Sequence, residues 1–157
     1  MTSDVAPTSC YVCAGNGATD NPPREEILRT SHWRVAHAFN STLPGWLVLL
    51  PLRHVDSFAE LSATAMAELG RLTGAASRAL HTEVGCTKTY AMQFSEAAGF
   101  HHLHVHLVPR MPDLPQEHRG PAIFHYLSRP ESEWLPASVT DELAERLAPV
   151  VARELSG

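Results

Sequence analysis

A run of histidines in strict alternation with apolar residues, at positions 102–108, constrains the fold of this chain more than any other feature. Alternation with a period of two is the pattern of a half-buried β-strand, because successive side chains point to opposite faces of a sheet. The pattern predicts that three histidines share one face and that three apolar residues face the core. These two sets are His102, His104 and His106, and Leu103, Val105 and Leu107.

The spacing of the three histidines indicates the kind of ligand that they could serve together. Same-face residues on a strand lie about 6.6 Å apart, so the first and third histidines are separated by about 13 Å. A row of that length is too long for three ligands of one metal, because His–Zn distances are about 2.0–2.1 Å. The row fits better along an extended polar ligand such as a chain of phosphates. The plain alternative is a strand whose histidines simply face solvent.

Further strands are predicted in segments that are short, apolar or alternating, and bounded by turn residues. They are residues 26–30, 33–37, 46–50 and 88–94. The continuous apolar run 46–50 is typical of a strand buried on both faces. A short connection over residues 95–99 joins the fourth segment to the histidine run, which predicts that these two are antiparallel neighbours.

Two segments have helical periodicity instead. Ser62 fits an N-cap, and apolar residues at three- and four-residue steps follow it until Gly85, which fits a helix stop. Ser138, with Asp141 three residues later, resembles a capping box that opens a last helix, and Pro149 should bend that helix. Strands, a long helix and more strands predict an α+β fold, with an antiparallel sheet packed against the helix.

Length, charge and the N-terminal residues limit which partners and which cellular location we expect. A chain of 157 residues fits one domain with its own core, and the net charge of −5 provides no basic footprint for a nucleic-acid backbone. Residues 1–9 contain neither a cationic region nor a long apolar run, so they predict no signal peptide and no membrane span. We therefore expect a cytoplasmic protein.

Cys10 and Cys13 form a CxxC pair, while Cys86 stands alone and is expected to act as a small hydrophobic residue. In a reducing compartment a close pair of cysteines is more often metal-binding or redox-active than a structural disulfide. Two thiolates supply only half of a tetrahedral zinc site. A redox dithiol and a pair of buried, unliganded cysteines remain the alternatives on spacing alone.

The run at 102–108 matches the pattern His-φ-His-φ-His-φ-φ at every position, and the chain resembles the histidine-triad (HIT) superfamily of nucleotidyl hydrolases and transferases. The resemblance implies an antiparallel sheet with one long packed helix and a C-terminal helix. It covers residues 10–110, so we expect a single domain over residues 1–157, with its core at 10–110 and a C-terminal extension at 111–157. It also implies a homodimer.

The resemblance assigns the chemistry to the second and third triad histidines. It implies that His104 attacks the α-phosphate of a nucleotide and forms a nucleotidyl-histidine, which water then cleaves. His106 would contact the same phosphate and stabilise its transition-state charge, with backbone amides near Gly99 as further donors.

A zinc-bearing branch of the superfamily has a CxxC pair, a histidine after a Pro-x-x segment, and the first triad histidine as zinc ligands. The resemblance therefore implies a structural zinc held by Cys10, Cys13, His54 and His102. Strand parity supports His102 over its neighbour His101, which would point to the other side.

Substrate contacts are implied at two polar positions, Asn40 near the ribose and Gln93 near the phosphate or ribose. The chain also departs from the family pattern. Ala98 and Gly99 stand where several members carry a polar donor, and Trp46 stands where a further histidine often follows the Pro-Gly turn. These departures put the leaving-group preference in doubt. The other histidines are expected to be surface or core residues rather than ligands: His32, His37, His81, His118 and His125.

The resulting hypothesis is an enzyme that acts on dinucleoside polyphosphates or nucleoside phosphoramidates, with adenine favoured as the base. It would need no catalytic metal, and a divalent cation would serve only as the companion of a polyphosphate. Two alternatives stay open: a zinc-dependent hydrolase that uses the His-x-His pair with an activated water, and a non-catalytic nucleotide-binding module.

Overall fold

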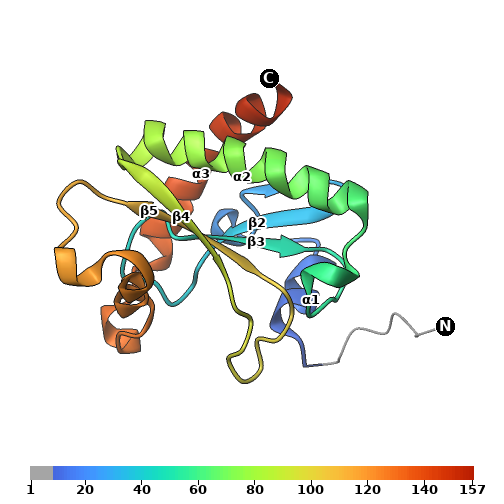
Figure 1. The fold of residues 1–157 in the computed structure, drawn as a ribbon, viewed down its shortest axis with the longest axis horizontal. Helices are drawn as coiled ribbons and strands as arrows, with labels where there is room; N and C mark the ends of the chain where they lie inside the picture. The colour runs from blue at the N-terminus through green and yellow to red at the C-terminus, as the bar shows by residue number, and fades with distance from the viewer. Residues whose placement is uncertain (1–8) are drawn as a thin grey trace.

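A computed structural model describes residues 9–157 of the chain (Figure 1). Our expectation that the chain begins without a signal peptide rests mainly on residues 1–8, which lie outside the described part. The regular elements, in chain order, are α1 (Tyr11–Gly17), the 3-10 helix η1 (Pro23–Glu25), β1 (Leu28–Arg29), β2 (Trp33–His37), β3 (Leu47–Pro51), η2 (Phe58–Glu60), α2 (Ala63–Val84), β4 (Lys88–Gln93), β5 (Val105–Arg110), η3 (Gln116–His118), η4 (Gly120–Leu127), η5 (Glu131–Glu133) and α3 (Ala137–Ser156).

The strands form one antiparallel sheet in the order β1-β2-β3-β5-β4. The apolar strand β3 is central, and it pairs with β2 on one side and with β5 on the other. Its burial on both faces follows from its continuous apolar sequence. The predicted α+β class, with an antiparallel sheet, a long helix and a C-terminal helix, is confirmed.

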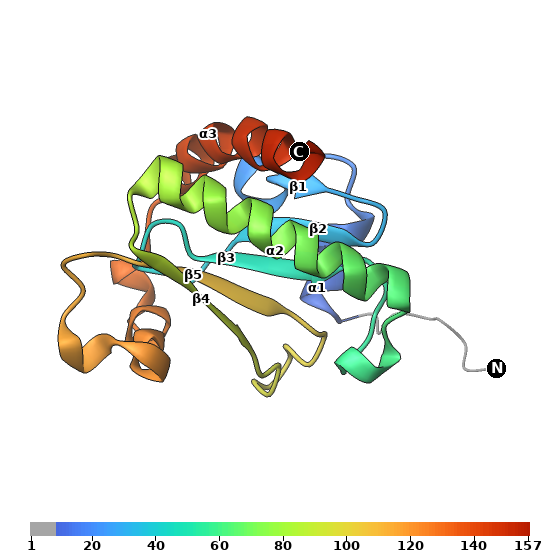
Figure 2. The same cartoon turned by 45° about the horizontal axis from the view of Figure 1, so that its top comes forward.

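Helices α2 and α3 lie together on one face of the sheet, as Figures 1 and 2 show. The main hydrophobic core lies between these helices and the sheet, and it includes Leu103, Val105 and Leu107. The apolar side of the histidine run therefore faces the helices, as its alternation predicted. Helix α2 begins after Ser62, whose side chain accepts from the backbone N–H of Ala65 at 3.1 Å, so the predicted N-cap is confirmed.

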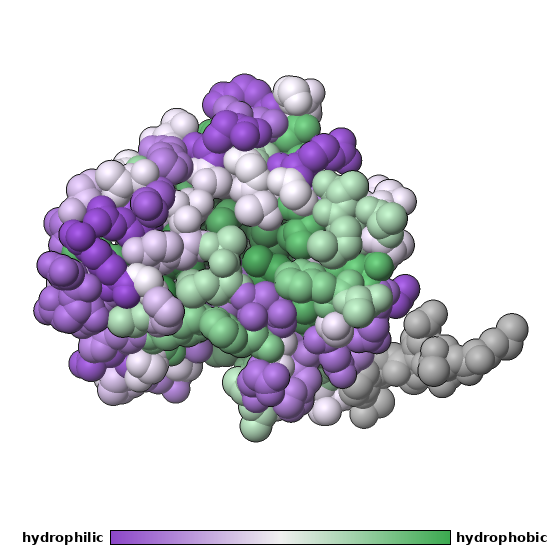
Figure 3. All heavy atoms as spheres, viewed as in Figure 1, coloured by the Kyte–Doolittle hydropathy of each residue, from purple (hydrophilic) through white to green (hydrophobic). Residues whose placement is uncertain are grey.

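The opposite face of the sheet is covered by shorter pieces of chain. Val12 of α1 packs against Ala36 and Leu50, while the segment after β5 packs a second cluster around Trp46 and Ile123. In Figure 3 apolar residues gather in the middle of the view, and hydrophilic residues are densest at the left, over the segment that follows β5. Two separate coverings leave room for a pocket between them.

None of the described helices combines the length and the apolar character that crossing a membrane requires.

The histidine segment enters the sheet later than its alternation predicted, because β5 begins at Val105. The ladder with β3 ends at the pair Leu49↔Val105, so the residues before it bond elsewhere. The N–H of Leu103 donates to the Val55 carbonyl at 2.7 Å, and that of His104 donates to Ser95 Oγ at 3.1 Å. Burial does not alternate along the run, because His102 and His106 are buried as well as the apolar residues, and only the last triad histidine lies in the regular strand.

The start of the last helix also differs from the prediction. Helix α3 begins at Ala137 with Pro136 as its N-cap, so Ser138 is inside the first turn. Asp141 does not close a capping box. Its carboxylate accepts from the backbone N–H of Arg24 at 3.0 Å and pairs with the Arg24 guanidinium at 2.8 Å. This long-range contact joins η1 to α3, and a local capping rule could not predict it.

Candidate metal centre and active-site pocket

Four potential metal ligands converge at one end of the sheet. Cys10 is the N-cap of α1, and its Sγ accepts from the backbone N–H of Cys13 at 3.4 Å, so one helical turn brings both thiols to the same side. His54 follows the end of β3, and His102 precedes β5. The four ligand atoms all lie within 4.8 Å of one another.

The separations between these atoms fit tetrahedral zinc. Cys10 Sγ lies 3.4 Å from His102 Nδ1, and Cys13 Sγ lies 3.3 Å from His54 Nδ1 and 3.5 Å from His102 Nδ1. With Zn–S near 2.3 Å and Zn–N near 2.0–2.1 Å, tetrahedral geometry places sulfur and nitrogen about 3.5 Å apart. The Nε2–H of His102 donates to the Pro51 carbonyl at 2.9 Å, which leaves Nδ1 with a lone pair for the metal.

The protonation chemistry of the cluster fits a bound metal ion. Burial lowers the pKa of His102 to about 4, so its imidazole is neutral and able to bind a metal. Burial, then the hydrogen bond and charge of neighbouring Cys10, raise the pKa of Cys13 to about 11. Two adjacent thiolates are therefore unfavourable without a metal ion between them. Four protein ligands leave no open position for water, so the zinc of this site is structural.

His104 lies beyond this cluster, and its ring orientation is fixed by the backbone. Its Nδ1–H donates to the His102 carbonyl at 2.8 Å, so Nε2 is the nitrogen that carries the free lone pair. The ring lines a pocket and lies 4.9 Å, centroid to centroid, from the ring of His106. An unprotonated imidazole nitrogen facing a pocket can act as a nucleophile or as a general base.

Ser95 holds His104 in place, although sequence reasoning gave it no role. Its buried Oγ accepts from the backbone N–H of His104 at 3.1 Å and from Nε2 of Gln93 at 2.9 Å. The backbone of Ser95 has a φ of 56°, in the left-handed region that non-glycine residues rarely adopt. This conformation turns the chain out of β4 and aims the hydroxyl at the residue before β5.

His106 is buried and carries its proton on a defined nitrogen. Trp46 Nε1–H donates to His106 Nδ1 at 3.0 Å, so a neutral His106 carries its hydrogen on Nε2. Burial, with a smaller effect from His104, lowers the pKa of His106 to about 3. His106 is therefore a neutral hydrogen-bond donor throughout the physiological pH range. An aromatic neighbour, Phe124 of η4, packs on its ring at a centroid distance of 5.1 Å.

The pocket has a volume of about 400 Å³ and lies on the sheet face opposite α2 and α3, because its lining residues alternate along the strands with those of the main core. Its floor crosses the sheet from β5 through Val48 of β3 to Ala36 of β2, which are neighbours in the strand register. His104 and His106 line one end. Tyr11 of α1 and Glu25 of η1 line the other. A slot with an apolar floor and imidazoles at one end can hold a flat ring together with a phosphate.

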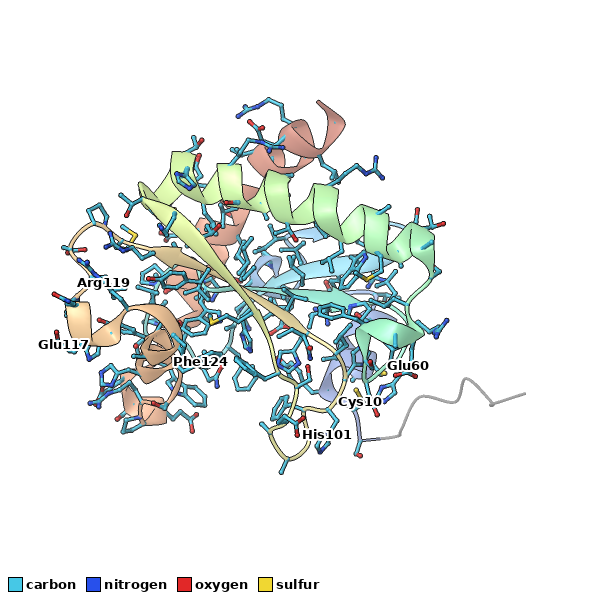
Figure 4. All side chains as sticks on the ribbon, viewed as in Figure 1. Cys10, Glu60, His101, Glu117, Arg119 and Phe124 are labelled. Atoms are coloured by element: carbon cyan, nitrogen blue, oxygen red, sulfur yellow. The ribbon has the colours of Figure 1, made fainter. Side chains whose placement is uncertain are left out.

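Of the three residues expected to contact the substrate, one lines the pocket and two lie outside its lining. Asn40 lines the pocket. Gln93 lies outside its lining and supports Ser95, while Gly99 is exposed in the 95–101 loop with a φ of 82°. His101 precedes β5 and is exposed, so strand parity does not apply to it, and it lies outside the metal cluster (Figure 4).

Several aromatic wall residues were missed by sequence reasoning. Phe39 packs on Tyr11 at a centroid distance of 5.3 Å and on Phe100 at 6.1 Å, and all three rings line the pocket. Phe124 points from η4 toward the sheet, on the same side of the sheet as Cys10 (Figure 4). Only the apolar patch at 123–127 marked η4 in the sequence, and nothing there indicated that it would reach the triad.

Solved structures with the same fold support this description. A zinc-bound histidine triad family protein from Mycobacterium smegmatis aligns with a TM-score of 0.67 at 17% identity, covering 92% of this chain and 94% of that one. A hypothetical histidine triad nucleotide-binding protein from Sulfolobus tokodaii gives 0.65 at 14%, covering 92% and 93%. A histidine triad protein from Bradyrhizobium japonicum gives 0.65 at 20%, covering 80% and 89%. At these identities the likeness concerns the fold.

An antiparallel sheet that delivers one triad histidine to a Cys₂His₂ zinc centre and the next two to a pocket defines a zinc-bearing histidine-triad protein. The HIT domain model matches residues 20–113, well over half of the sequence, and the chain belongs to the HIT family. Members of this family are generally nucleotide-binding hydrolases and transferases.

Proposed function

We propose that the protein is a nucleotidyl hydrolase or transferase in which His104 attacks the α-phosphate of a bound nucleotide. The observation that carries the proposal is the bond from His104 Nδ1–H to the His102 carbonyl, 2.8 Å long, which leaves an unprotonated Nε2 at the pocket. Attack by Nε2 forms a P–N bond, and the leaving group departs with the electron pair of its bond to phosphorus and takes up a proton from solvent. Water then attacks the nucleotidyl-histidine, loses a proton to solvent, and returns the P–N electron pair to Nε2.

In this proposal His106 stabilises the charge that develops on the phosphate. Because Trp46 occupies Nδ1, the Nε2–H of His106 is the donor available to a phosphate oxygen. A neutral donor at this position is ready in advance and does not have to change protonation during the reaction. No step involves the zinc, whose role is to fix the segment that leads to His104.

The charge of the pocket supports a substrate with few phosphates. Glu25 and Glu96 line it, and none of the described lining residues is Lys or Arg. Of the two substrate classes expected, nucleoside phosphoramidates carry less negative charge than dinucleoside polyphosphates, which would need a divalent cation as companion. The family resemblance suggests adenine as the base. Asn40, Gln93 and Gly99 remain proposed contacts.

Three broader expectations also remain proposals. The packing of α3 on α2 and of Phe124 on His106 supports a single domain in which residues 111–157 belong to the working unit. Homodimer formation is implied by the resemblance, and a cytoplasmic location stays a prediction from the sequence.

Two other functions predict different behaviour. A non-catalytic nucleotide-binding module has one observation in its favour, since Ala98 and Gly99 replace donor side chains of the family. A zinc-dependent hydrolase is disfavoured, because His102 completes a closed four-ligand site and His104 does not take part in it.

Trapping of the covalent intermediate tests the proposal. Acid-free quenching of protein turning over a nucleoside phosphoramidate should give a nucleotidyl adduct, and peptide mapping should place it on His104. The His104→Ala variant should bind nucleotide, form no adduct and show no turnover. Full turnover by this variant would remove His104 from the reaction, and tight binding without turnover by the wild type would identify a binding module.

A further inference from the structure

The end of the pocket across the sheet from His104 carries an anchored carboxylate. Tyr11 Oη–H donates to Glu25 Oε1 at 2.8 Å, and the other carboxylate oxygen of Glu25 lies 3.6 Å from Nη1 of Arg34. The Arg34 side chain is fully buried, and its Nη1 also donates to the Glu25 carbonyl. Both the backbone and the side chain of Glu25 are therefore held, while Glu25 lines the pocket and its side chain remains 17% exposed.

The distance between the two ends of the pocket suits one nucleotide. The N–H of Ile27 donates to the Val35 carbonyl at 2.8 Å, so Ile27 lies beside β2. Glu25 precedes Ile27 by two residues and therefore lies beyond β2. From β5 to this row are three strand spacings, or about 14 Å. A nucleotide whose phosphorus lies at His104 would extend its base over Val48 and Ala36, so the Watson–Crick edge of the base would face Glu25.

We propose that Glu25, positioned by Tyr11, reads the Watson–Crick edge of the base and selects guanine over adenine. This inference rests on the proposed function for the placement of the phosphate. It replaces the base suggested by family resemblance with one suggested by the chemistry of this pocket.

The donor and acceptor pattern carries the selection. An ionised carboxylate only accepts hydrogen bonds, and the Tyr11 hydroxyl has its hydrogen on Glu25, so this end of the pocket offers acceptors. Guanine presents two adjacent donors, N1–H and the N2 amino group. Adenine presents its N6 amino group beside the lone pair of N1, which would face a carboxylate oxygen. Hypoxanthine keeps N1–H and lacks the amino group, so it should rank between them.

The aromatic residues near this end do not account for the selection. Phe39 and Phe100 offer ring faces, and stacking on an aromatic ring tolerates every base. They should contribute to affinity for all nucleotides to a similar extent. The acceptors of Glu25 are the part of this end that distinguishes one purine from another, because they leave a mismatched base with an unpaired or repelled group.

Binding of nucleoside monophosphates to the zinc-loaded full-length protein tests this proposal. In isothermal titration, GMP should bind at least about tenfold more tightly than AMP, with IMP between them. Glu25→Gln replaces one acceptor by a donor that can meet adenine N1, so the GMP/AMP affinity ratio should fall by about tenfold or more. Glu26→Gln is the matched control, since Glu26 pairs with Arg29 and lies outside the pocket lining, and its ratio should equal that of the wild type.

A second variant tests the same proposal even if Glu25→Gln does not fold. Tyr11→Phe removes the hydroxyl that positions Glu25 and should weaken GMP binding more than AMP binding. Equal affinities for GMP and AMP in the wild type, or a ratio unchanged in both variants, would overturn the base assignment. Titration requires no turnover, so a clear GMP preference in a protein that forms no adduct would refute the proposed reaction and leave the base assignment standing.

Discussion

The indole Nε1–H of Trp46 donates to His106 Nδ1 at 3.0 Å, and both side chains are buried. The two residues meet because Trp46 lies immediately before β3, which pairs with β5, and His106 lies in β5. At the position of Trp46 the family often carries a further active-site histidine. Here the indole supplies an N–H that fixes the tautomer of the third triad histidine, so the departure from the family pattern has a defined structural role.

Replacement of Trp46 by Phe should therefore impair catalysis more than binding. Without the indole N–H, His106 can place its hydrogen on either ring nitrogen, and part of the population would present a lone pair to the phosphate. We expect kcat to fall by about 10- to 100-fold with a small change in KM, measured on a nucleoside phosphoramidate. Trp33→Phe is a matched control, because Trp33 Nε1–H donates to the Ala65 carbonyl in the main core. It should lower stability and leave kcat unchanged, and equal kcat losses in the two variants would contradict the role given to Trp46.

Removal of the zinc should destabilise the protein, because the zinc holds the fold together and takes no part in the reaction. Cys13→Ser should reduce the bound zinc from about one equivalent to almost none, because a thiolate is lost from a four-ligand site. Binding of zinc to the folded state alone stabilises it by about 4 kcal/mol when free zinc is about 1,000 times Kd, so the variant should unfold at markedly lower denaturant concentration. Cys86→Ala is the control, since Cys86 lies in the main core away from the cluster, and it should keep its full zinc content. Retention of stoichiometric zinc by the Cys13→Ser variant would contradict the assignment.

Much of this arrangement could be predicted from sequence because it depends on local periodicity. The alternation at 102–108 assigned the apolar residues to the helix-covered face, and the Ser62 N-cap placed the start of α2 at the observed residue. The CxxC pair converges with His54 and His102 because a helical N-terminus and two strand ends meet at the same end of the sheet. The resemblance to the family named that set of four, and spacing alone did not.

The remaining features depend on contacts between distant residues. Asp141 reaches Arg24 across the fold, and Phe124 reaches His106 from a segment with irregular periodicity. Ser95 acts through a positive φ that its residue type does not predict. Gln93 stays a proposed substrate contact, and its bond to Ser95, made where the chain leaves β4, was not predicted. Sequence patterns specify which face a side chain occupies more readily than which neighbour it meets.

Ser95 combines two effects that substitution can separate. Ser95→Ala removes the acceptor for the His104 N–H and keeps the strained backbone, whereas Ser95→Gly removes the same acceptor and relieves the strain. Both variants should lose activity by about tenfold, because His104 is no longer held. Urea unfolding should show Ser95→Gly to be about 1 kcal/mol more stable than Ser95→Ala, since a non-glycine residue at positive φ costs about that much. If the alanine variant were the more stable of the two, backbone strain at this position would be excluded.

The buried His106 should make the protein sensitive to mild acid. Its pKa of about 3 in the folded protein lies below the ordinary value of 6.5, so the unfolded chain takes up a proton that the folded chain does not. Stability from this group is present above pH 6.5 and is lost as the pH falls from 6.5 toward 3. By pH 5 the loss amounts to about 2 kcal/mol.

Comparison of the wild type with His106→Gln isolates this contribution, because the zinc ligands titrate in both proteins. Between pH 7.5 and pH 5, the free energy of unfolding of the variant should fall by about 2 kcal/mol less than that of the wild type. His101→Gln is the control, since His101 is exposed in the loop before the triad, and it should follow the wild-type curve. Parallel pH curves for wild type and His106→Gln would show that His106 is accessible to protons in the folded state, which would also remove the basis for treating it as a permanently neutral donor.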